Sequence, residues 1–410
     1  MWFCMKNTPT IETSTLNEIR QTFQEKGQPQ KVVLQQLKSR LQRDFTYDSG
    51  MILSSMCTQP HNFATKVFTQ NLDKNLGDPT LFPATAEIEK ETIQMLGSLL
   101  SNPNASGHIV TGGTEANILA LWAFRNLANK HRREVIVPNS AHFSFDKAAD
   151  LLNLKLVRVR LNSDYQVDVK AVEKAVSSKT LAIVGVAGTT ELGVVDPISE
   201  LSEIALKHDM CLHVDAAFGG FVLPFLRDLG YAVPSFDFRE PGVCSITMDP
   251  HKMGLAPIPA GGILFRDAAF LEGIAKKVPY MADVETKQTA LVGTRSGASA
   301  IAVWSLLKHL GMEGYRKIIG RCMRLTLKFA NEIQQIEGIS LATQPTMNIV
   351  GIKSDRINVQ WLMQELRNRG WAISLIQNFI RIVIMPHTRL SYVENLLEDI
   401  KHIVKRYDRH

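Results

Sequence analysis

The strongest chemical signal in this sequence is the segment 245–254, SITMDPHKMG. An apolar, β-like run over 243–248 leads directly into Asp249, His251 and Lys252. A buried lysine ammonium costs free energy unless its charge is paired or chemically used. We therefore interpret Lys252 as a reactive amine that forms a Schiff base with a carbonyl compound.

Two other apolar runs also end in residues with useful chemistry. Asp215 follows the run 211–214 and precedes several small residues, and His142 comes shortly after the run 134–137. A carboxylate beside a pyridine nitrogen favours the protonated form of that nitrogen, and an imidazole can stack on an aromatic ring. Taken alone, Asp215 could instead be an N-cap or a salt-bridge partner, and His142 a hydrogen-bonded core histidine.

A phosphate site is predicted at 111–117, TGGTEAN, between an apolar run and a helical pattern. Glycines such as Gly113 allow a close approach of the backbone, and Thr114 brings a hydroxyl to the helix start, where free N–H groups and the helix dipole favour an anion. The segment matches neither GxGxxG nor GxxxxGK[ST], and an ordinary turn would also explain it. A second turn, 188–193, offers the hydroxyl of Thr190, although this turn too could be purely structural.

Considered together, these groups predict pyridoxal 5′-phosphate (PLP) as the cofactor. PLP needs a lysine amine, an acid at its ring nitrogen, a group that covers the ring and a site for its phosphate. Its protonated ring then accepts electrons from a carbanion. Each residue has a plain structural explanation of its own, but all of those explanations would have to hold at once.

The elements that must position these residues alternate regularly. Apolar runs lie at 108–111, 134–137, 156–161, 181–187, 211–214, 243–248 and 262–265, and helical patterns lie at 114–130, 143–152, 169–176 and 197–207. This alternation predicts an α/β fold with a mostly parallel seven-stranded sheet. Ligands bind such sheets at the carboxyl ends of the strands. Asp196 and Pro197 predict a helix start, with Asp196 as the N-cap.

We predict three domains. Residues 1–50 form an N-terminal arm and helix that clasp a second subunit, 51–298 form the large cofactor domain, and 299–410 form a smaller α+β domain. The last of these is expected to hold two long helices (301–310 and 315–336) and further strands and helices at 347–352, 359–369, 372–376, 379–385 and 391–407.

Composition excludes several functional classes. The chain has 410 residues and a net charge of +6, and its basic residues are scattered, which argues against nucleic-acid binding. Five widely spaced cysteines predict neither a disulfide framework nor a metal site and favour a cytoplasmic protein. No run approaches the roughly 18 apolar residues of a membrane span.

A resemblance to a known protein family narrows the predicted function. The chain resembles the group II PLP-dependent decarboxylases, and most closely the archaeal-type L-tyrosine/L-aspartate decarboxylases, over about 31–405. The segments that carry the resemblance are TGGTEAN, HFSFDKA, AGTTELG, HVDAAFGG and DPHKMG. It implies the fold-type I architecture of PLP-dependent transferases, a homodimer with active sites at the subunit interface, and a Schiff base between Lys252 and PLP.

The resemblance also implies roles for individual residues. His142 would stack on the PLP ring, Asp215 would pair with its nitrogen, and Arg381 would bind the substrate α-carboxylate through a bidentate grip. The cofactor-binding residues that it implies beside Lys252 are Gly113, Thr114, His142, Thr190, Asp215, Ala217 and His251.

Two residues near the divergent stretch 276–292 have open roles. Tyr280 is a candidate acid for protonating the decarboxylated carbon, or else a surface or interface tyrosine. Arg295 is a candidate for the partner's cofactor phosphate or for a structural pairing.

The predicted function is decarboxylation of an L-amino acid, with tyrosine or aspartate favoured and glutamate possible. One alternative is a PLP-dependent carbon–carbon lyase of the sphingosine-phosphate lyase type. Another is a catalytically silent scaffold with a PLP fold. Residues that select the substrate are expected in loops near 54–61 and 76–84, or on a second subunit.

Overall fold

The computed structural model describes residues 23–279 and 287–407. Its contacts divide the chain into two units, Met1–Phe45 and Thr46–His410. The first unit holds the helix α1 (Gln30–Leu41), which begins after Pro29. Basic residues in its last turn interact favourably with the negative end of the helix dipole. Its apolar side chains, among them Leu34 and Leu37, are exposed.

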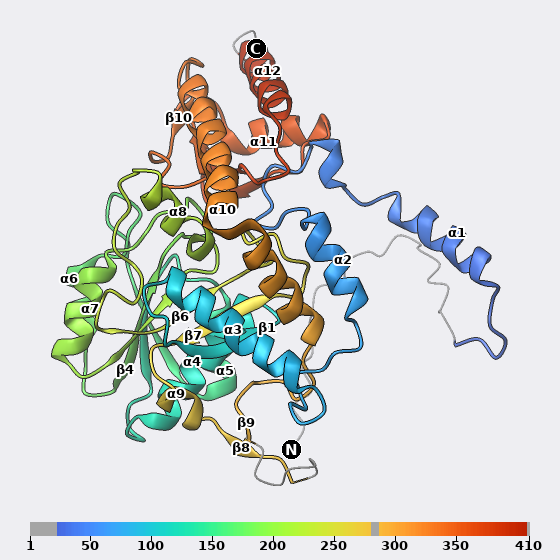
Figure 1. Cartoon of the computed structure of the whole chain (residues 1–410). Coiled ribbons are helices and arrows are strands. Elements are labelled where there is room, and N and C mark those ends of the chain that lie inside the picture. The colour runs from blue at the N-terminus through green and yellow to red at the C-terminus, as the bar shows by residue number, and fades with distance from the viewer. Residues whose placement is uncertain (1–22, 280–286, 408–410) are drawn as a thin grey trace, which may run out of the picture. The chain divides into compact units, whose positions relative to one another are not determined.

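The larger unit is built on a seven-stranded sheet in the order β1-β7-β6-β5-β4-β2-β3 (Figure 1). β7 runs antiparallel to both β1 and β6, and the remaining pairings are parallel. The predicted mostly parallel sheet is therefore confirmed. The strands are β1 (Ser106–Val110), β2 (Glu134–Pro138), β3 (Lys155–Val159), β4 (Thr180–Val186), β5 (Cys211–Asp215), β6 (Val243–Met248) and β7 (Gly261–Phe265).

Both faces of this sheet are covered, as its apolar strands require. Successive residues of β4 enter different hydrophobic clusters, since Ile183 packs into one cluster while Ala182 and Val184 pack into another. The helices of this region are α2 (Asn62–Gln70), α3 (Pro83–Leu99), α4 (Gly113–Leu127), α5 (Ser144–Leu152), α6 (Val169–Ala175), α7 (Ile198–Lys207), α8 (Leu223–Asp228) and α9 (Ala269–Glu272).

The start of α7 differs from the prediction. Pro197 occupies the N-cap position and makes no side-chain cap, so the predicted Asp196 cap is wrong. The buried carboxylate of Asp196 instead accepts hydrogen bonds from the backbone N–H groups of Val167 (2.7 Å) and Val186 (2.8 Å). Its burial raises the pKa of Asp196 to about 6.

The C-terminal part begins with α10 (Gly297–Ile333). A break at Gly311, whose φ of 55° lies in the left-handed region that favours glycine, separates two helical stretches, in agreement with the two helices predicted there. α10 is followed by an antiparallel sheet in the order β10-β11-β13-β12. The elements after α10 are β10 (Ser340–Leu341), β11 (Ile349–Lys353), α11 (Val359–Asn368), β12 (Ser374–Ile376), β13 (Phe379–Val383) and α12 (Leu390–Tyr407).

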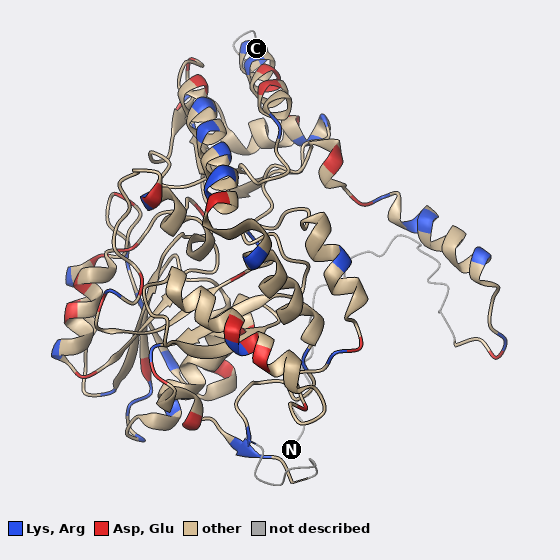
Figure 2. Ribbon diagram, viewed as in Figure 1, with Lys and Arg blue, Asp and Glu red and all other residues tan. Residues whose placement is uncertain are grey.

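This C-terminal part has a hydrophobic core of its own. Phe329 of α10, Ile382 of β13 and Leu396 of α12 all belong to one buried cluster. The exact boundaries of the predicted domains stay a prediction. Figure 2 shows Lys and Arg spread along the helices together with Asp and Glu. Within residues 23–279 and 287–407, no helix is both long and apolar enough to span a membrane.

Candidate active site

A cavity of about 430 Å³ lies where several strands of the large sheet end. Its volume falls within the range of small-molecule sites. It collects side chains from segments that follow different strands, because parallel strands end at the same edge of a sheet. The predicted site residues that line it are Gly113, Thr114, His142, Thr190, Asp215, Ala217, His251 and Lys252.

Lys252 follows β6 in a turn that pairs it with Asp249. Its Nζ lies 3.1 Å from Oδ2 of Asp249, and about a fifth of its side-chain surface is exposed. Burial alone would lower the pKa of Lys252, but the carboxylates of Asp249 and Asp215 outweigh burial and raise it. The amine is therefore held as an ammonium ion. The sequence analysis named Asp249 but assigned it no role, because its pairing with Lys252 depends on how the turn is folded.

Two glycines shape the segment between β1 and α4. A Cβ atom at Gly112 would lie 3.1 Å from the His251 ring, and one at Gly113 would lie 3.0 Å from the Asp249 carboxylate. The loop is also fixed by Glu115, whose Oε2 accepts hydrogen bonds at 2.8 Å from the N–H and the hydroxyl of Thr111. Both glycines thus keep the N-terminus of α4 open beside Lys252, where the helix dipole favours a phosphate.

Both histidines of the cavity are held by backbone groups. Nδ1 of His142 accepts a hydrogen bond from Ser144 N–H (3.3 Å), and Nδ1 of His251 accepts one from Ala260 N–H (3.2 Å). Burial lowers the pKa of both rings. Each is therefore a neutral imidazole at pH 7, which suits stacking on a ring for His142 and hydrogen bonding for His251.

Asp215 ends β5 and presents its carboxylate to the cavity. Its Oδ1 accepts a hydrogen bond from Ala217 N–H (3.1 Å), and its Oδ2 accepts one from Nδ2 of Asn117 (2.9 Å). Asn117 is a site residue that the sequence analysis did not single out. The available signal was a polar residue between the apolar Ala116 and Ile118 of α4.

One predicted residue, Arg381, is not among those that line the cavity. Arg381 lies on β13 and donates from Nη1 to the carbonyl of Thr190 (2.8 Å) and from Nη2 to the carbonyl of Ser54 (2.7 Å). It thereby ties the C-terminal sheet to the turn after β4, and its role toward a substrate carboxylate stays a prediction. Tyr280 lies outside the described residues.

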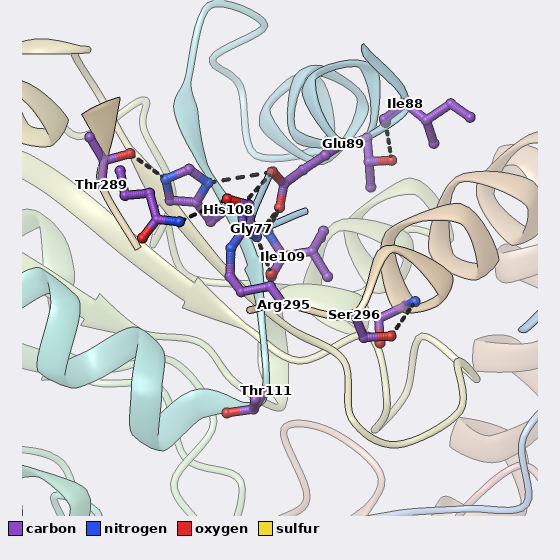
Figure 3. A network of polar contacts seen from close by, with 12 residues as sticks. Gly77, Ile88, Glu89, His108, Ile109, Thr111, Thr289, Arg295 and Ser296 are labelled. Atoms are coloured by element: carbon purple, nitrogen blue, oxygen red, sulfur yellow. Dashed lines mark hydrogen bonds and ion pairs between the residues drawn. The ribbon is translucent and has the colours of Figure 1, made fainter. Parts of the chain in front are cut away.

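Arg295 forms a structural ion pair beside the site (Figure 3). Its guanidinium binds both carboxylate oxygens of Glu89 and also donates to the carbonyl of Ile109 (2.9 Å). His108 belongs to the same cluster, and its Nε2 lies 2.7 Å from Oγ1 of Thr289. Burial alone would raise the pKa of Glu89, but Arg295 and His108 lower it to about 2. Of the two roles open for Arg295, the structure thus shows the structural pairing.

The residues around the cavity fit PLP. An amine, a carboxylate, a neutral imidazole and an open helix N-terminus face one space of suitable size, and Oδ1 of Asp249 is buried there without a hydrogen-bond partner among the described residues. In the part of the chain that the structure describes, no cluster of His, Cys, Asp or Glu could hold a metal ion. The fold and the site together define an α/β enzyme of the PLP-dependent class.

Comparison with known proteins identifies the family within this class. The model of the pyridoxal-dependent decarboxylase conserved domain matches residues 14–354. The chain therefore belongs to the pyridoxal-dependent decarboxylase family, and it is a PLP-dependent amino-acid decarboxylase, as predicted.

Two archaeal relatives match over nearly the whole chain. The chain is 51% identical to an L-aspartate decarboxylase of Thermococcus kodakarensis over 384 residues, which cover 94% of this chain and 100% of the relative. It is also 51% identical to a probable L-tyrosine/L-aspartate decarboxylase of Methanothermobacter thermautotrophicus, over 87% of this chain and 98% of the relative. These matches confirm the family that the sequence motifs indicated.

Among solved structures, a sphingosine-1-phosphate lyase of Burkholderia pseudomallei superposes with a TM-score of 0.87. The two proteins are 28% identical, and the match covers 96% of this chain and 93% of the other. It supports the predicted fold. The lyase alternative is less supported, because the relatives of much higher identity are decarboxylases.

Proposed function

We propose that this enzyme removes the α-carboxyl group of L-aspartate or L-tyrosine as CO₂ and releases the corresponding amine, with L-glutamate as a weaker candidate. The observation that carries the proposal is the 51% identity to an L-aspartate decarboxylase along that protein's full length. Of the two favoured substrates, L-aspartate comes first, because both of the archaeal relatives described above carry aspartate in their names.

The proposed cofactor contacts follow from the cavity. Gly113, Thr114 and His251 hold the phosphate of PLP at the N-terminus of α4, and the neutral ring of His142 covers one face of the pyridine and excludes water from it. Thr190 and Ala217 complete the contacts at neighbouring strand ends. Bound PLP supplies an acceptor for the electron pair left on the α-carbon when CO₂ departs.

The chain's own residues handle protons and orientation. Asp215 would keep a proton on the ring nitrogen, because its carboxylate accepts hydrogen bonds at both oxygens and stays aimed into the cavity. Asp249 pairs with the ammonium of Lys252 and holds it in the cavity. Lys252 is the amine that would hold PLP and would take its place again as the amine product leaves. Arg381 binds the substrate carboxylate and Tyr280 protonates the α-carbon, as the family resemblance implies.

The proposed assembly is a cytoplasmic homodimer with active sites at its interface. α1 leaves apolar side chains exposed, including Leu34, Leu37 and Leu41. Exposed apolar surface of this kind commonly marks a protein–protein contact. A second copy of this chain is the proposed partner, and its residues would complete the substrate pocket.

A panel of amino acids tests the substrate. Purified enzyme with added PLP is incubated with L-aspartate, L-tyrosine and L-glutamate, and both CO₂ and the amine are measured. We expect CO₂ and an equal amount of amine from L-aspartate or L-tyrosine. Aldehyde release from a phosphorylated long-chain amine, without CO₂ from any amino acid, would support the lyase alternative instead.

The lysine is tested in the same assay. Lys252→Ala is expected to lower turnover by several orders of magnitude and to leave no cofactor covalently attached to the protein after borohydride reduction, because only a Schiff base to a lysine is reduced to a stable secondary amine. Lys207→Ala, at a lysine of α7 in an exposed ion pair with Glu173, serves as the control. Turnover of the Lys252 variant at the wild-type rate contradicts the proposed role.

A further inference from the structure

Asn117 is the centre of a buried polar network behind Asp215. Its side chain is almost fully buried in α4, and every hydrogen-bonding position that it has is used. Nδ2 donates to Oγ of Ser144 and to Oδ2 of Asp215, both at 2.9 Å. Oδ1 accepts from Oγ1 of Thr247 at 2.7 Å and lies 3.0 Å from Nε2 of His213.

The carboxylate of Asp215, which accepts N–H groups at both oxygens, sets the direction of this network. Because a carboxylate only accepts hydrogen bonds, the amide of Asn117 must turn its NH₂ group toward Asp215 and its oxygen toward His213. Nε2 of His213 must then carry the proton. Nδ1 of His213, at 2.8 Å from Oγ of Ser245, is left as an acceptor for the serine hydroxyl.

The network is neutral except for Asp215. His213 is fully buried, and this burial lowers its pKa to about 4, so that its imidazole is uncharged at pH 7. Hydrogen bonds linked in one direction polarise each other in a medium of low dielectric constant. The chain from Ser245 through His213 and Asn117 therefore strengthens the bond to Asp215 without neutralising its charge.

The neutral state of His213 affects how well Asp215 can stabilise a protonated ring nitrogen of the cofactor. A charged His213 would compensate the negative charge of Asp215, and Asp215 would then stabilise a pyridinium less well. With neutral donors, the carboxylate keeps its full charge and a fixed orientation toward the cavity. Its second oxygen is held by Ala217 N–H, so it cannot rotate away.

We propose that Asn117 and His213 are positioning residues, which hold the carboxylate of Asp215 aimed at the ring nitrogen of PLP, with His213 acting through its Nε2–H group. The inference rests on the proposed role of Asp215. Neither residue contacts the reacting atoms in this proposal, and both act through the carboxylate.

Two substitutions of His213 separate donation from packing. The amide nitrogen of glutamine reaches the position of Nε2, whereas the shorter asparagine side chain reaches only that of Nδ1. Holoenzymes of the wild type, His213→Gln and His213→Asn are prepared with ¹⁵N-labelled PLP. The ¹⁵N chemical shift of the ring nitrogen is followed against pH, and the Kd for PLP is measured by titration.

We expect the ring nitrogen to stay protonated at pH 7 in the wild type and in His213→Gln. In His213→Asn we expect partial loss of that proton and a Kd for PLP that rises by about tenfold, in line with the effect of losing a supporting hydrogen bond behind a binding group. Equal impairment of both variants would show that the histidine only packs, and wild-type behaviour of both would show that it is not needed. Either result overturns the inference.

A variant of Asn117 gives an independent measurement. Asn117→Leu has a similar volume but carries no group that can donate to Asp215 or accept from His213. We expect it to lower the protonated fraction of the ring nitrogen more than His213→Asn does. An unchanged ring nitrogen in Asn117→Leu, with native circular dichroism, overturns the inference.

Two further measurements distinguish the inference from the proposal on which it rests. Asp215→Asn must itself reduce ring protonation; if it does not, the proposed role of Asp215 fails. If Asp215→Asn does reduce it while the His213 and Asn117 variants match the wild type, only the positioning role fails. In apoenzyme with ¹⁵N-labelled histidine, His213 should show a proton on Nε2 alone between pH 5 and 8, and a doubly protonated ring at pH 7 contradicts the inference.

Discussion

At the scale of single residues, the contact between Lys252 and Asp249 decides the state of the amine. The carboxylate lies 3.1 Å from Nζ and is almost completely buried, so its charge acts through a medium of low dielectric constant. An amine must be neutral to attack a carbonyl. We therefore expect Asp249 to affect the pH at which the enzyme takes up its cofactor.

We predict that Asp249→Asn shifts the pH dependence of PLP association to lower pH. Asp249 raises the pKa of Lys252, so its removal lets the ammonium lose its proton at a lower pH. The rate at which apoenzyme and PLP develop visible absorbance is measured from pH 6 to 10. Asp146→Asn, at an exposed ion pair with Arg158, is the control and should leave the midpoint unchanged. An unchanged midpoint in Asp249→Asn contradicts the assignment.

At the scale of elements, the pair between Glu89 and Arg295 joins α3 to the chain segment that precedes α10 (Figure 3). The pKa of Glu89 is about 2 in the folded protein, below the value of about 4.3 for an unperturbed glutamate. A depressed carboxylate pKa stabilises the fold above the unfolded value. This contribution, about 3 kcal/mol, is lost as the pH falls from about 4.3 toward 2.

We predict that Glu89→Gln lowers the free energy of unfolding at pH 7 by about 3–5 kcal/mol, because it leaves the charge of Arg295 buried and unpaired. The double variant with Arg295→Met should recover part of that loss. Urea unfolding at pH 7 and at pH 4 measures both effects, and the variant should lose stability less steeply than the wild type as the pH falls. Glu313→Gln, in an exposed pair with Lys317, should leave stability unchanged. If the free energy of unfolding depended equally on pH in the wild type and in Glu89→Gln, the lowered pKa of Glu89 would not contribute to stability.

The break in α10 depends on one backbone conformation. Gly311 has a φ of 55°, and a Cβ atom there would meet nothing within 4 Å. We predict that Gly311→Ala lowers the free energy of unfolding by about 1–3 kcal/mol through backbone strain alone. Gly293→Ala, just before α10, lies outside the positive-φ glycines and would bring its Cβ only into ordinary contact with Gln288 (3.7 Å), so it should show no such loss. Thermal unfolding measures both variants, and equal stabilities would show that α10 tolerates a continuous helix.

At the scale of the whole molecule, the proposed dimer is tested through α1. We predict that Leu34→Glu combined with Leu37→Glu shifts the protein from dimer to monomer, because it places charges on the exposed apolar side of the helix. Turnover should fall in parallel if the active sites are completed across the interface. Sedimentation at several protein concentrations measures the assembly. Gln35→Glu with Gln36→Glu adds the same charge to the same helix and should leave the assembly intact; dissociation in both variants would reject a specific role for the leucines.

Patterns in short stretches of the sequence determined most elements of the large sheet and several site residues. The seven strands, four of the helices between them (α4, α5, α6 and α7) and the residues at the strand ends were predicted, because each depends on the periodicity of a short stretch, whereas the short helix α8 was not. Lys252, Asp215 and His142 meet in one cavity because the strands that precede them are parallel, which alternation with helices already implied. The residues at the strand ends predicted the cofactor, and the family resemblance added the reaction class.

Only the tertiary structure decided which partner each buried polar group finds. Asp196 bonds to the backbone of neighbouring segments rather than capping its helix, and Asn117 meets His213, 96 residues away in sequence. Arg381 reaches the carbonyl of Ser54, which lies 327 residues earlier in the chain. Such partners depend on strand order and register, which no short window of sequence contains. A buried donor or acceptor must be satisfied by whatever the packed fold brings to it, and for Asp215 that is the network behind the cofactor site.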